Sequence, residues 1–362
     1  MTAEPSPIRP APIEPGGAYS RSTRAQAAGL LPAVELFEQS AKEVELPHPP
    51  QTIVIADYGA SAGHNSLLPI GLAIGALRKR AEPGRAIFVV HTEVAENDYT
   101  TLFQTLADDL HSYLRDDPAT FSAAVGRSFY QQILPSNSVT LGWSSWAVQW
   151  LSRVPAPIPD HIQVAYSRDS SARSAYSRLA AEDWIAFLTA RSRELVPGGH
   201  LVVLTMAQDD DEFGYRPLLE GIVAELAVMA GEGLITDREV CRMGIPTVGR
   251  SEADLMVPFA PKNRFAGLTI ENLDLFVAED QFWTRYEKDG NADSFAAGWT
   301  AFARSSIFPT LATALDGGLD DPRTRQFFDR LSAGLNARLA QAPEPLRIPL
   351  AKLLVVKQSW PR

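Results

Sequence analysis

The chain has 362 residues, of which 45% are hydrophobic and 21% charged, an ordinary composition for a folded globular protein. Its formal net charge of −10 argues against nucleic acid or an anionic membrane as a main partner. Cys241 is the single cysteine, so an internal disulfide and a cysteine-based metal site are excluded, and the histidines form no His-x-x-x-His pair. We therefore expect no metal. There is no secretory signal and no apolar run of roughly 18 residues, so we expect a cytoplasmic protein without a membrane span.

The N-terminal segment is rich in proline. Residues 1–17 hold five prolines and end on two glycines, which predicts a flexible arm. The polar segment 19–26 follows, and on its own it is interpreted as a helix cap with solvated arginines. Apolar spacing then predicts a helix at 30–41.

The chain is organised around a strand, a glycine loop and a helix. The β-branched run 53–55 predicts a strand buried on both faces of a parallel sheet. This strand ends on Asp57, and a loop with Gly59 and Gly63 leads into a predicted helix at 66–80. Such a loop binds adenosine-type cofactors, because glycines let the backbone approach the ligand and the helix N-terminus offers free N–H groups.

Two other interpretations of the glycine loop compete with this one. Its residues also spell the Gly-x-Ser-x-Gly elbow of serine hydrolases, with Ser61 as the nucleophile. That elbow normally follows several strands, however, and none is predicted before residue 52. The dinucleotide fingerprint fits less well, because Ser61 replaces its second glycine and Gly63 arrives one position early.

An acidic residue follows the second predicted strand. This strand is predicted at 86–91, and Glu93 comes shortly after it. An acid at this point of an α/β sheet holds a ribose diol, because one carboxylate can accept hydrogen bonds from both hydroxyls. On its own, such an acid is more often a surface charge.

A cluster of tryptophans follows the next predicted strand. A helix is predicted at 99–114, a loop-rich segment at 126–138 and a strand at 139–143. Three tryptophans lie within eight residues from the end of that strand. They indicate either a ligand wall or a structural core, and the sequence alone does not separate the two.

The second half of the chain alternates strands with helical insertions. Its predicted elements are a connection at 155–178, a helix at 180–195, a strand at 200–206, a helix at 218–234, a strand at 268–277, helices between 278 and 340, and a strand at 350–357. Two helical insertions separated by a strand predict a cap folded over the carboxyl edge of the sheet.

These motifs together resemble the SABATH family of S-adenosylmethionine-dependent carboxyl methyltransferases, including its bacterial branch. The resemblance extends from Tyr19 to about Lys357, and the family motifs occur in the right order. The matching segments are 19–26, 56–65, 92–99, 127–130 and 144–155.

The resemblance implies an α/β fold with a mostly parallel, methyltransferase-type (Rossmann-like) sheet, an antiparallel edge hairpin and a helical cap. It also implies a homodimer. The expected division is a flexible arm at 1–17, an S-adenosylmethionine-binding domain at 18–207, a cap insertion at 208–267, a core strand at 268–278, a second cap insertion at 279–345 and a terminal core strand at 346–362.

The resemblance further implies S-adenosyl-L-methionine as the cofactor. Thr23, Asp57 and Asn65 would hold its methionine part, Glu93 its ribose, and other residues its adenine. The full set implied to bind the cofactor is Tyr19, Thr23, Asp57, Gly59, Asn65, Glu93, Val94, Ser128, Phe129 and Ser144. Glu93 and Thr23 replace the aspartate and serine of the family, which keeps the chemistry with one extra carbon.

The catalytic residues implied by the family are Gln26 and Trp150, which would orient the carboxylate of a small-molecule acid. No general base is required, because carboxylic acids titrate near pH 4 and are ionised at neutral pH. The enzyme then has to align the reacting atoms and exclude water.

The acceptor acid is predicted from the residues that align with the substrate pocket of the family. These are Trp146, Gln149, Leu218, Leu219, Val248, Ala303 and Ser306. Leucine, valine and alanine in place of aromatic residues predict a long aliphatic slot, and hence methylation of free fatty acids. The near alternative is an aromatic acid such as benzoate or salicylate, and a cofactor-binding protein without activity is a third possibility.

Overall fold

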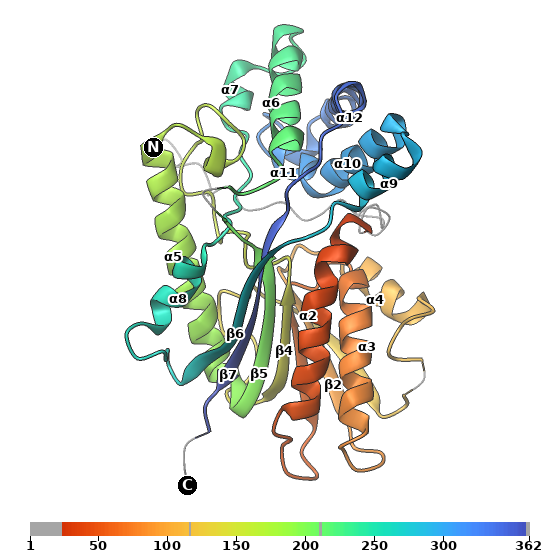
Figure 1. Cartoon of the computed structure of the whole chain (residues 1–362), viewed down its shortest axis with the longest axis vertical. Coiled ribbons are helices and arrows are strands. Elements are labelled where there is room, and N and C mark those ends of the chain that lie inside the picture. The colour runs from red at the N-terminus through yellow and green to blue at the C-terminus, as the bar shows by residue number, and fades with distance from the viewer. Residues whose placement is uncertain (1–23, 116, 210–211, 360–362) are drawn as a thin grey trace.

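The computed structural model describes residues 24–115, 117–209 and 212–359 (Figure 1). Tyr19 and Thr23, both expected to bind the cofactor, lie outside these residues. Gln26 lies in the first described helix, but its side chain is outside the described part of the structure.

A single sheet of seven strands, in the order β3-β2-β1-β4-β5-β7-β6, forms the centre of the described structure. Strands β1 to β5 run parallel to one another, whereas β7 runs antiparallel to both β5 and β6. The predicted mostly parallel sheet with an antiparallel edge is therefore confirmed. The strands are β1 Ile53–Tyr58, β2 Ile87–Glu93, β3 Thr120–Gly126, β4 Val139–Ser145, β5 Leu195–Met206, β6 Leu268–Val277 and β7 Pro349–Lys357.

The strand order reverses between β1 and β4. The chain moves outward from β1 through β2 to β3, then returns to the other side of β1 with β4 and β5. In open α/β sheets, the carboxyl ends of strands at such a switch point form the ligand-binding crevice. The topology thus directs attention to the loops that follow β1, β2 and β4.

Helices cover both faces of the sheet, because successive strand residues alternate between two apolar clusters. Phe37 of α2 and Ile70 of α3 belong to one cluster, and Trp184 and Phe187 of α5 belong to the other. The helices are α2 Arg24–Glu43, α3 His64–Arg78, α4 Tyr99–Asp108, α5 Ser170–Glu194, α6 Arg216–Gly231, α7 Asp237–Val240, α8 Glu252–Met256, α9 Gln281–Asp289, α10 Ala292–Ser306, α11 Phe308–Ala312 and α12 Thr324–Gln341.

A second layer of helices stands over the carboxyl end of the parallel strands (Figure 1). We call α6, α7 and α9 to α12, with the loops between them, the cap. Glu225 of α6 is buried against Gly334 of α12, where an added Cβ would lie 1.9 Å from a Glu225 carboxylate oxygen. Glu225 also pairs with Arg338, which ties α6 to α12. The short helix α8 instead packs on the sheet, since its Leu255 joins the cluster of Trp184. The division into domains stays a prediction.

Three segments differ from the sequence prediction. Strand β3 was not predicted, because it lies between the predicted helix at 99–114 and the predicted loop-rich segment that begins at 126. Helix α4 ends at Asp108 rather than continuing to 114. Helix α5 begins at Ser170, inside the expected connection, because the Asp169 side chain accepts a hydrogen bond from Ala172 N at 2.7 Å and caps the helix. Among the described residues, no helix is both long and apolar enough to cross a membrane.

Candidate active site

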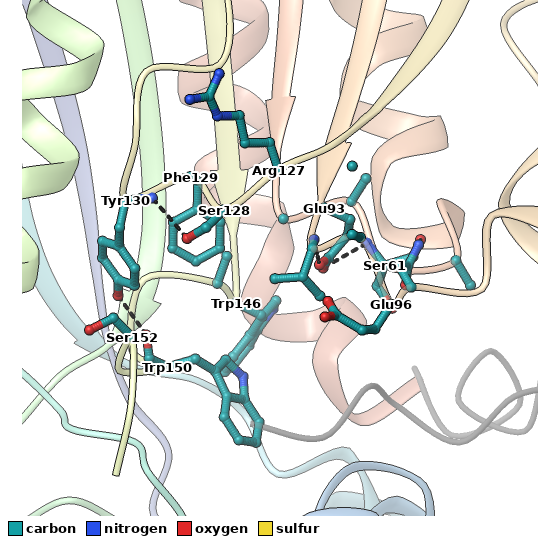
Figure 2. Close-up of a pocket in the computed structure, with 18 of the residues that line it drawn as sticks. Ser61, Glu93, Glu96, Arg127, Ser128, Phe129, Tyr130, Trp146, Trp150 and Ser152 are labelled. Carbon is teal, nitrogen blue, oxygen red and sulfur yellow. Dashed lines mark hydrogen bonds between the residues drawn. The ribbon is translucent and has the colours of Figure 1, made fainter. Parts of the chain in front are cut away.

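A pocket of about 800 Å³ opens at the carboxyl ends of β1, β2 and β4, where the topology predicts a ligand site. Loops after these strands and after β3 supply most of its lining (Figure 2). The lining consists of residues 59–66, 93–97, 126–131, 145–147 and 150–152, with Asp183, Thr313 and Leu319.

The loop after β1 requires glycine at two positions. Gly59 has φ +90°, and an added Cβ would lie 2.4 Å from the Cβ of Ala147. Gly63 has φ +85°, and its Cβ would lie 2.7 Å from Leu102. Both backbone conformation and space therefore favour glycine. Gly63 is also the N-cap of α3, so the free N–H groups of that helix start at the pocket.

Glu93 lies at the end of β2 and lines the pocket. Its carboxylate accepts hydrogen bonds from Val94 N at 2.7 Å and from Ser61 N at 3.3 Å (Figure 2). Burial raises the pKa of Glu93, and the charge of Asp57 raises it further, while the two backbone N–H groups act in the opposite direction. Glu93 thus links the glycine loop to the second loop of the site, and it is not an isolated surface charge.

Asp57 is buried behind the loop and paired with a histidine. In the register of β1 and β2 it lies opposite His91, and Asp57 Oδ2 is 2.8 Å from His91 Nδ1. The other ring nitrogen of His91 lies 2.7 Å from the hydroxyl of Tyr113. An ionised carboxylate only accepts hydrogen bonds, so His91 Nδ1–H is the donor to Asp57. Asp57 is therefore held in one orientation, although it is not among the residues that line the pocket.

Phe129 and Ser128 line the pocket from the segment after β3. A buried ion pair holds this segment from behind. Arg191 donates to the carbonyl oxygens of Phe129 and Gln131 at 2.8 and 2.9 Å, and its guanidinium lies 2.9 Å from the carboxylate of Glu194. Both charged side chains are fully buried. The backbone of Phe129 is thus fixed by α5.

Two tryptophans form the side of the pocket that follows β4 (Figure 2). Trp146 has φ +55°, an uncommon conformation for a non-glycine residue, and its indole Nε1 is buried without a hydrogen-bond partner among the described residues. Trp150 is half-buried, and its carbonyl oxygen accepts from the Tyr130 hydroxyl at 2.5 Å. Trp146 and Trp150 of the tryptophan cluster therefore line the pocket, whereas Trp143 lies in the core.

The structure brings together some of the expected site residues and not others. Gly59, Asn65, Glu93, Val94, Ser128, Phe129, Trp146 and Trp150 all line the pocket. The side chain of Ser144 is buried and donates to Tyr58 O at 2.9 Å. Gln149 is buried and donates to Trp146 O at 2.7 Å.

Most residues expected in the acceptor pocket lie elsewhere. Leu218, Leu219 and Ala303 are buried in the apolar core that the cap shares with one face of the sheet. Ser306 donates to Phe302 O at 2.6 Å, and Val248 lines a second pocket of about 480 Å³ beside α5.

Asp183, Thr313 and Leu319 also line the pocket, although they lie far along the chain from the motif segments in which the sequence predicted the site. Of these, Asp183 is buried and accepts from Ser152 N at 2.8 Å, and burial raises its pKa. No spacing in the sequence connects Thr313 or Leu319 to the glycine loop, because only the tertiary fold brings them together.

Comparison with known proteins agrees with this geometry. A family model described as "SAM dependent carboxyl methyltransferase" matches residues 15–344. The chain is 29% identical to the S-adenosyl-L-methionine:benzoic acid/salicylic acid carboxyl methyltransferase 3 of Petunia hybrida, over 66% of this chain and 70% of that protein. It is also 29% identical to methyltransferase FUS9 of Gibberella fujikuroi, over 70% and 68% respectively.

Among solved structures, a loganic acid methyltransferase with SAH shares the fold, with a TM-score of 0.75 and 20% identity over 97% of this chain and 99% of that one. The family match covers far more than half of the 362 residues. The chain therefore belongs to the SABATH family of S-adenosylmethionine-dependent carboxyl methyltransferases.

Proposed function

We propose that this enzyme methylates the carboxylate of a free fatty acid, with an aromatic acid of the benzoate or salicylate kind as the second candidate. One observation carries the proposal. A single pocket has a glycine loop with an acidic ribose-type residue on one side, and two indoles with an apolar cap residue on the other. The two halves suit a nucleoside cofactor and an organic acid.

The cofactor half fits S-adenosyl-L-methionine on features of this chain. The conformations of Gly59 and Gly63 leave the loop without side chains where a ligand approaches, and α3 begins at the same place. The Glu93 carboxylate would accept from the ribose hydroxyls, and Phe129 would pack on the adenine. Asn65, with the buried Asp57 behind it, would hold the methionine part. When bound, the cofactor supplies an electrophilic methyl group.

The residues of this chain then have to position the acid. Trp150 would donate its indole N–H to one carboxylate oxygen, with Gln26 as the expected second donor. The Trp150 backbone is fixed by the Tyr130 hydroxyl, so the indole starts from a defined position. Because the acid is already ionised, these residues orient it and keep water out, and no group has to remove a proton.

Support for a fatty acid comes from the cap side of the pocket. The described cap residues that line it are Thr313 and Leu319, neither of which has an aromatic ring. A methyl and an isobutyl group suit an aliphatic chain. Support for an aromatic acid comes from the two indoles, against which a flat ring would pack, and from the named activity of the Petunia relative.

The test is a competition between acids. Labelled S-adenosyl-L-methionine is incubated with saturated fatty acids of graded length, benzoate and salicylate, and the methyl esters are identified by mass spectrometry. We expect the highest kcat/KM for a fatty acid. A higher value for benzoate or salicylate would establish the second candidate, and cofactor binding without any ester would support a protein that has lost activity.

We also propose that the enzyme is a cytoplasmic homodimer. Support comes from the single cysteine, which gives no internal disulfide, and from the family resemblance for the dimer. Light scattering on the purified protein measures the mass, and a monomer at assay concentration would rule out the dimer.

A further inference from the structure

The cap reaches the pocket through one short loop. Of the described residues that line the pocket, only Thr313 and Leu319 belong to the cap, and the others come from the sheet loops and from α3 and α5. Both lie in residues 313–321, which we call the cap loop, between α11 and α12. The Leu319 side chain is 42% exposed, so a large apolar group stands partly uncovered at the pocket.

We infer that Leu319 is a specificity-determining residue for the acceptor acid, and that the ion pairs of Glu239, Arg323 and Asp321 position it. This inference rests on the proposed function, because it assumes that the acid occupies the side of the pocket facing the cap. The aliphatic contact with the acid is then made by the cap loop, and not by the buried leucines of α6 as the sequence predicted.

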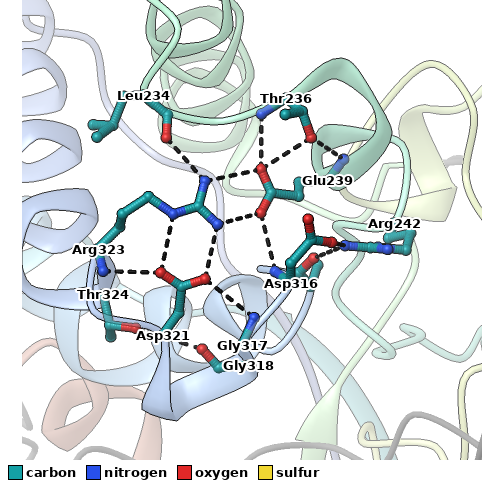
Figure 3. A network of polar contacts seen from close by, with 11 residues as sticks. Leu234, Thr236, Glu239, Arg242, Asp316, Gly317, Gly318, Asp321, Arg323 and Thr324 are labelled. Atoms are coloured by element: carbon teal, nitrogen blue, oxygen red, sulfur yellow. Dashed lines mark hydrogen bonds and ion pairs between the residues drawn. The ribbon is translucent and has the colours of Figure 1, made fainter.

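The cap loop is held by side chains outside the pocket (Figure 3). Asp316 N donates to the Glu239 carboxylate at 3.0 Å, and Gly317 N donates to the Asp321 carboxylate at 3.1 Å. Arg242 adds a bond to Ala314 O at 2.6 Å and an ion pair with Asp316 at 2.7 Å. The backbone of the cap loop just before Gly318 is therefore held by Arg242 and by the carboxylates of Glu239 and Asp321.

Arg323 connects these acceptors. Its guanidinium lies 2.6 Å from a Glu239 oxygen and forms two bonds with Asp321, at 2.8 and 3.0 Å (Figure 3). Glu239 is fully buried and also accepts from Thr236 N at 2.8 Å, and the Arg323 hydrogen bonds lower its pKa to about 2. Removing one partner of such a pair leaves a buried charge without compensation, so the remaining groups have to move.

The residues that hold the cap loop are different from the residues that line the pocket, so the two roles can be tested separately. Glu239, Arg323 and Asp321 do not line the pocket, and the glycine loop and Glu93 belong to other segments. Changes in the network should therefore alter the binding of the acid while leaving cofactor affinity nearly constant. A role limited to folding would not distinguish between the two ligands.

The first experiment changes the contact residue. Leu319→Ala is expected to raise KM for the preferred acid roughly three- to tenfold, because a pocket that loses methylenes discriminates by about this much, reduced by partial exposure. Leu319→Trp is expected to shift preference toward smaller acids. Leu110→Ala is the matched control, since Leu110 is 78% exposed and does not line the pocket.

Two readouts separate this inference from the proposed function. Cofactor affinity is measured by calorimetry and should stay within about twofold in each variant. Unchanged KM for every acid in both Leu319 variants, with ester formed by the wild type, would overturn the inference alone. A wild type that forms no ester would overturn the proposed function first.

The second experiment tests the network through Leu319. Asp321→Asn is expected to raise KM for the acid with little change in cofactor affinity, and Asp321→Glu to recover part of the effect. In the double variant with Leu319→Ala, KM should be no higher than in the worse single variant, because both changes remove the same contact. Multiplicative effects would overturn the positioning role. Glu239→Gln repeats the test on the partner side, with thermal unfolding as a check of folding.

Discussion

Replacing Glu93 by glutamine removes a negative charge from the pocket while it keeps the length of the side chain. The amide oxygen can still accept from Val94 N or Ser61 N, whereas alanine would lose both bonds and loosen the glycine loop. The glutamine variant therefore isolates the contribution of charge to cofactor binding.

The expected loss of cofactor affinity follows from weakening two hydrogen bonds between residue 93 and the ribose hydroxyls. A bond to a charged group contributes about 1.5–3 kcal/mol and a neutral one about 0.5–1.5 kcal/mol, so each bond weakens by about 1 kcal/mol. The total of about 2 kcal/mol corresponds to a roughly thirtyfold lower affinity for S-adenosyl-L-methionine, measured by isothermal titration calorimetry. Glu96→Gln is the control, because it removes an equal charge from the exposed rim of the same pocket.

The pH dependence gives a second readout. Burial raises the pKa of Glu93, so on acidification it takes up a proton above the ordinary range of glutamate, and cofactor affinity should fall there. The raised pKa also means that the charged form costs folding free energy at neutral pH, a cost that is relieved as the pH falls through the folded pKa. Glu93→Gln without cofactor should thus be at least as stable as the wild type in urea. Unchanged affinity with unchanged pH dependence would refute the ribose role, leaving Glu93 as a loop tie only.

Three further predictions concern the loop, the segment after β3 and the indole. Gly59→Ala should lower the free energy of unfolding in urea by roughly 2–5 kcal/mol, because it adds both backbone strain and overpacking. Gly84→Ala is the control, since Gly84 has φ +75° and nothing within 4 Å of an added Cβ, so it should show the strain alone. Equal losses in the two variants would refute the clash at Gly59. Arg191→Met should cost about 3–5 kcal/mol of stability, because the buried Glu194 charge loses its cation and keeps only its neutral donors. Adding Glu194→Gln should recover part of the stability but not the cofactor affinity, and full recovery of both would contradict a positioning role. Trp150→Phe should lower turnover on the order of a hundredfold with cofactor affinity unchanged, and full turnover would make Trp150 a wall only.

The side of the pocket formed by the glycine loop and Glu93, which we propose for the cofactor, was largely predictable from the sequence. A buried β-branched run, two glycines and a strand-end acid are local features, and parallel strands bring their carboxyl ends to one edge of the sheet. The pairing of His91 with Asp57 was also predictable, because His91 lies the same distance along β2 as Asp57 lies along β1. Strand β3 was missed since it is a half-buried edge strand built mainly of small residues, without a continuous apolar run.

The cap side of the pocket, which we propose for the acid, was not predictable in the same way. Leu218, Leu219 and Ala303 have the residue types of an aliphatic slot, but those types equally fill the core of a helical cap, and that is where they lie. Leu319 follows two glycines in a turn, where nothing in the sequence marks a ligand contact. Its approach to the pocket depends on Glu239 and Arg323, which are far apart in the sequence.

Two buried ionic groups stand behind the two halves of the pocket. Arg191 and Glu194 hold the segment of Phe129 on the cofactor side, and Glu239 with Arg323 holds the cap loop on the other. Buried ion pairs are weak evidence for stability, because desolvation offsets much of their attraction. In both places, however, the charged groups also bind backbone atoms of a segment that lines the pocket. Because the two backbones are held independently, substitutions in the cap loop could change which acid binds without disturbing the proposed cofactor side. The free-energy changes caused by one substitution in each group should therefore add in the double variant.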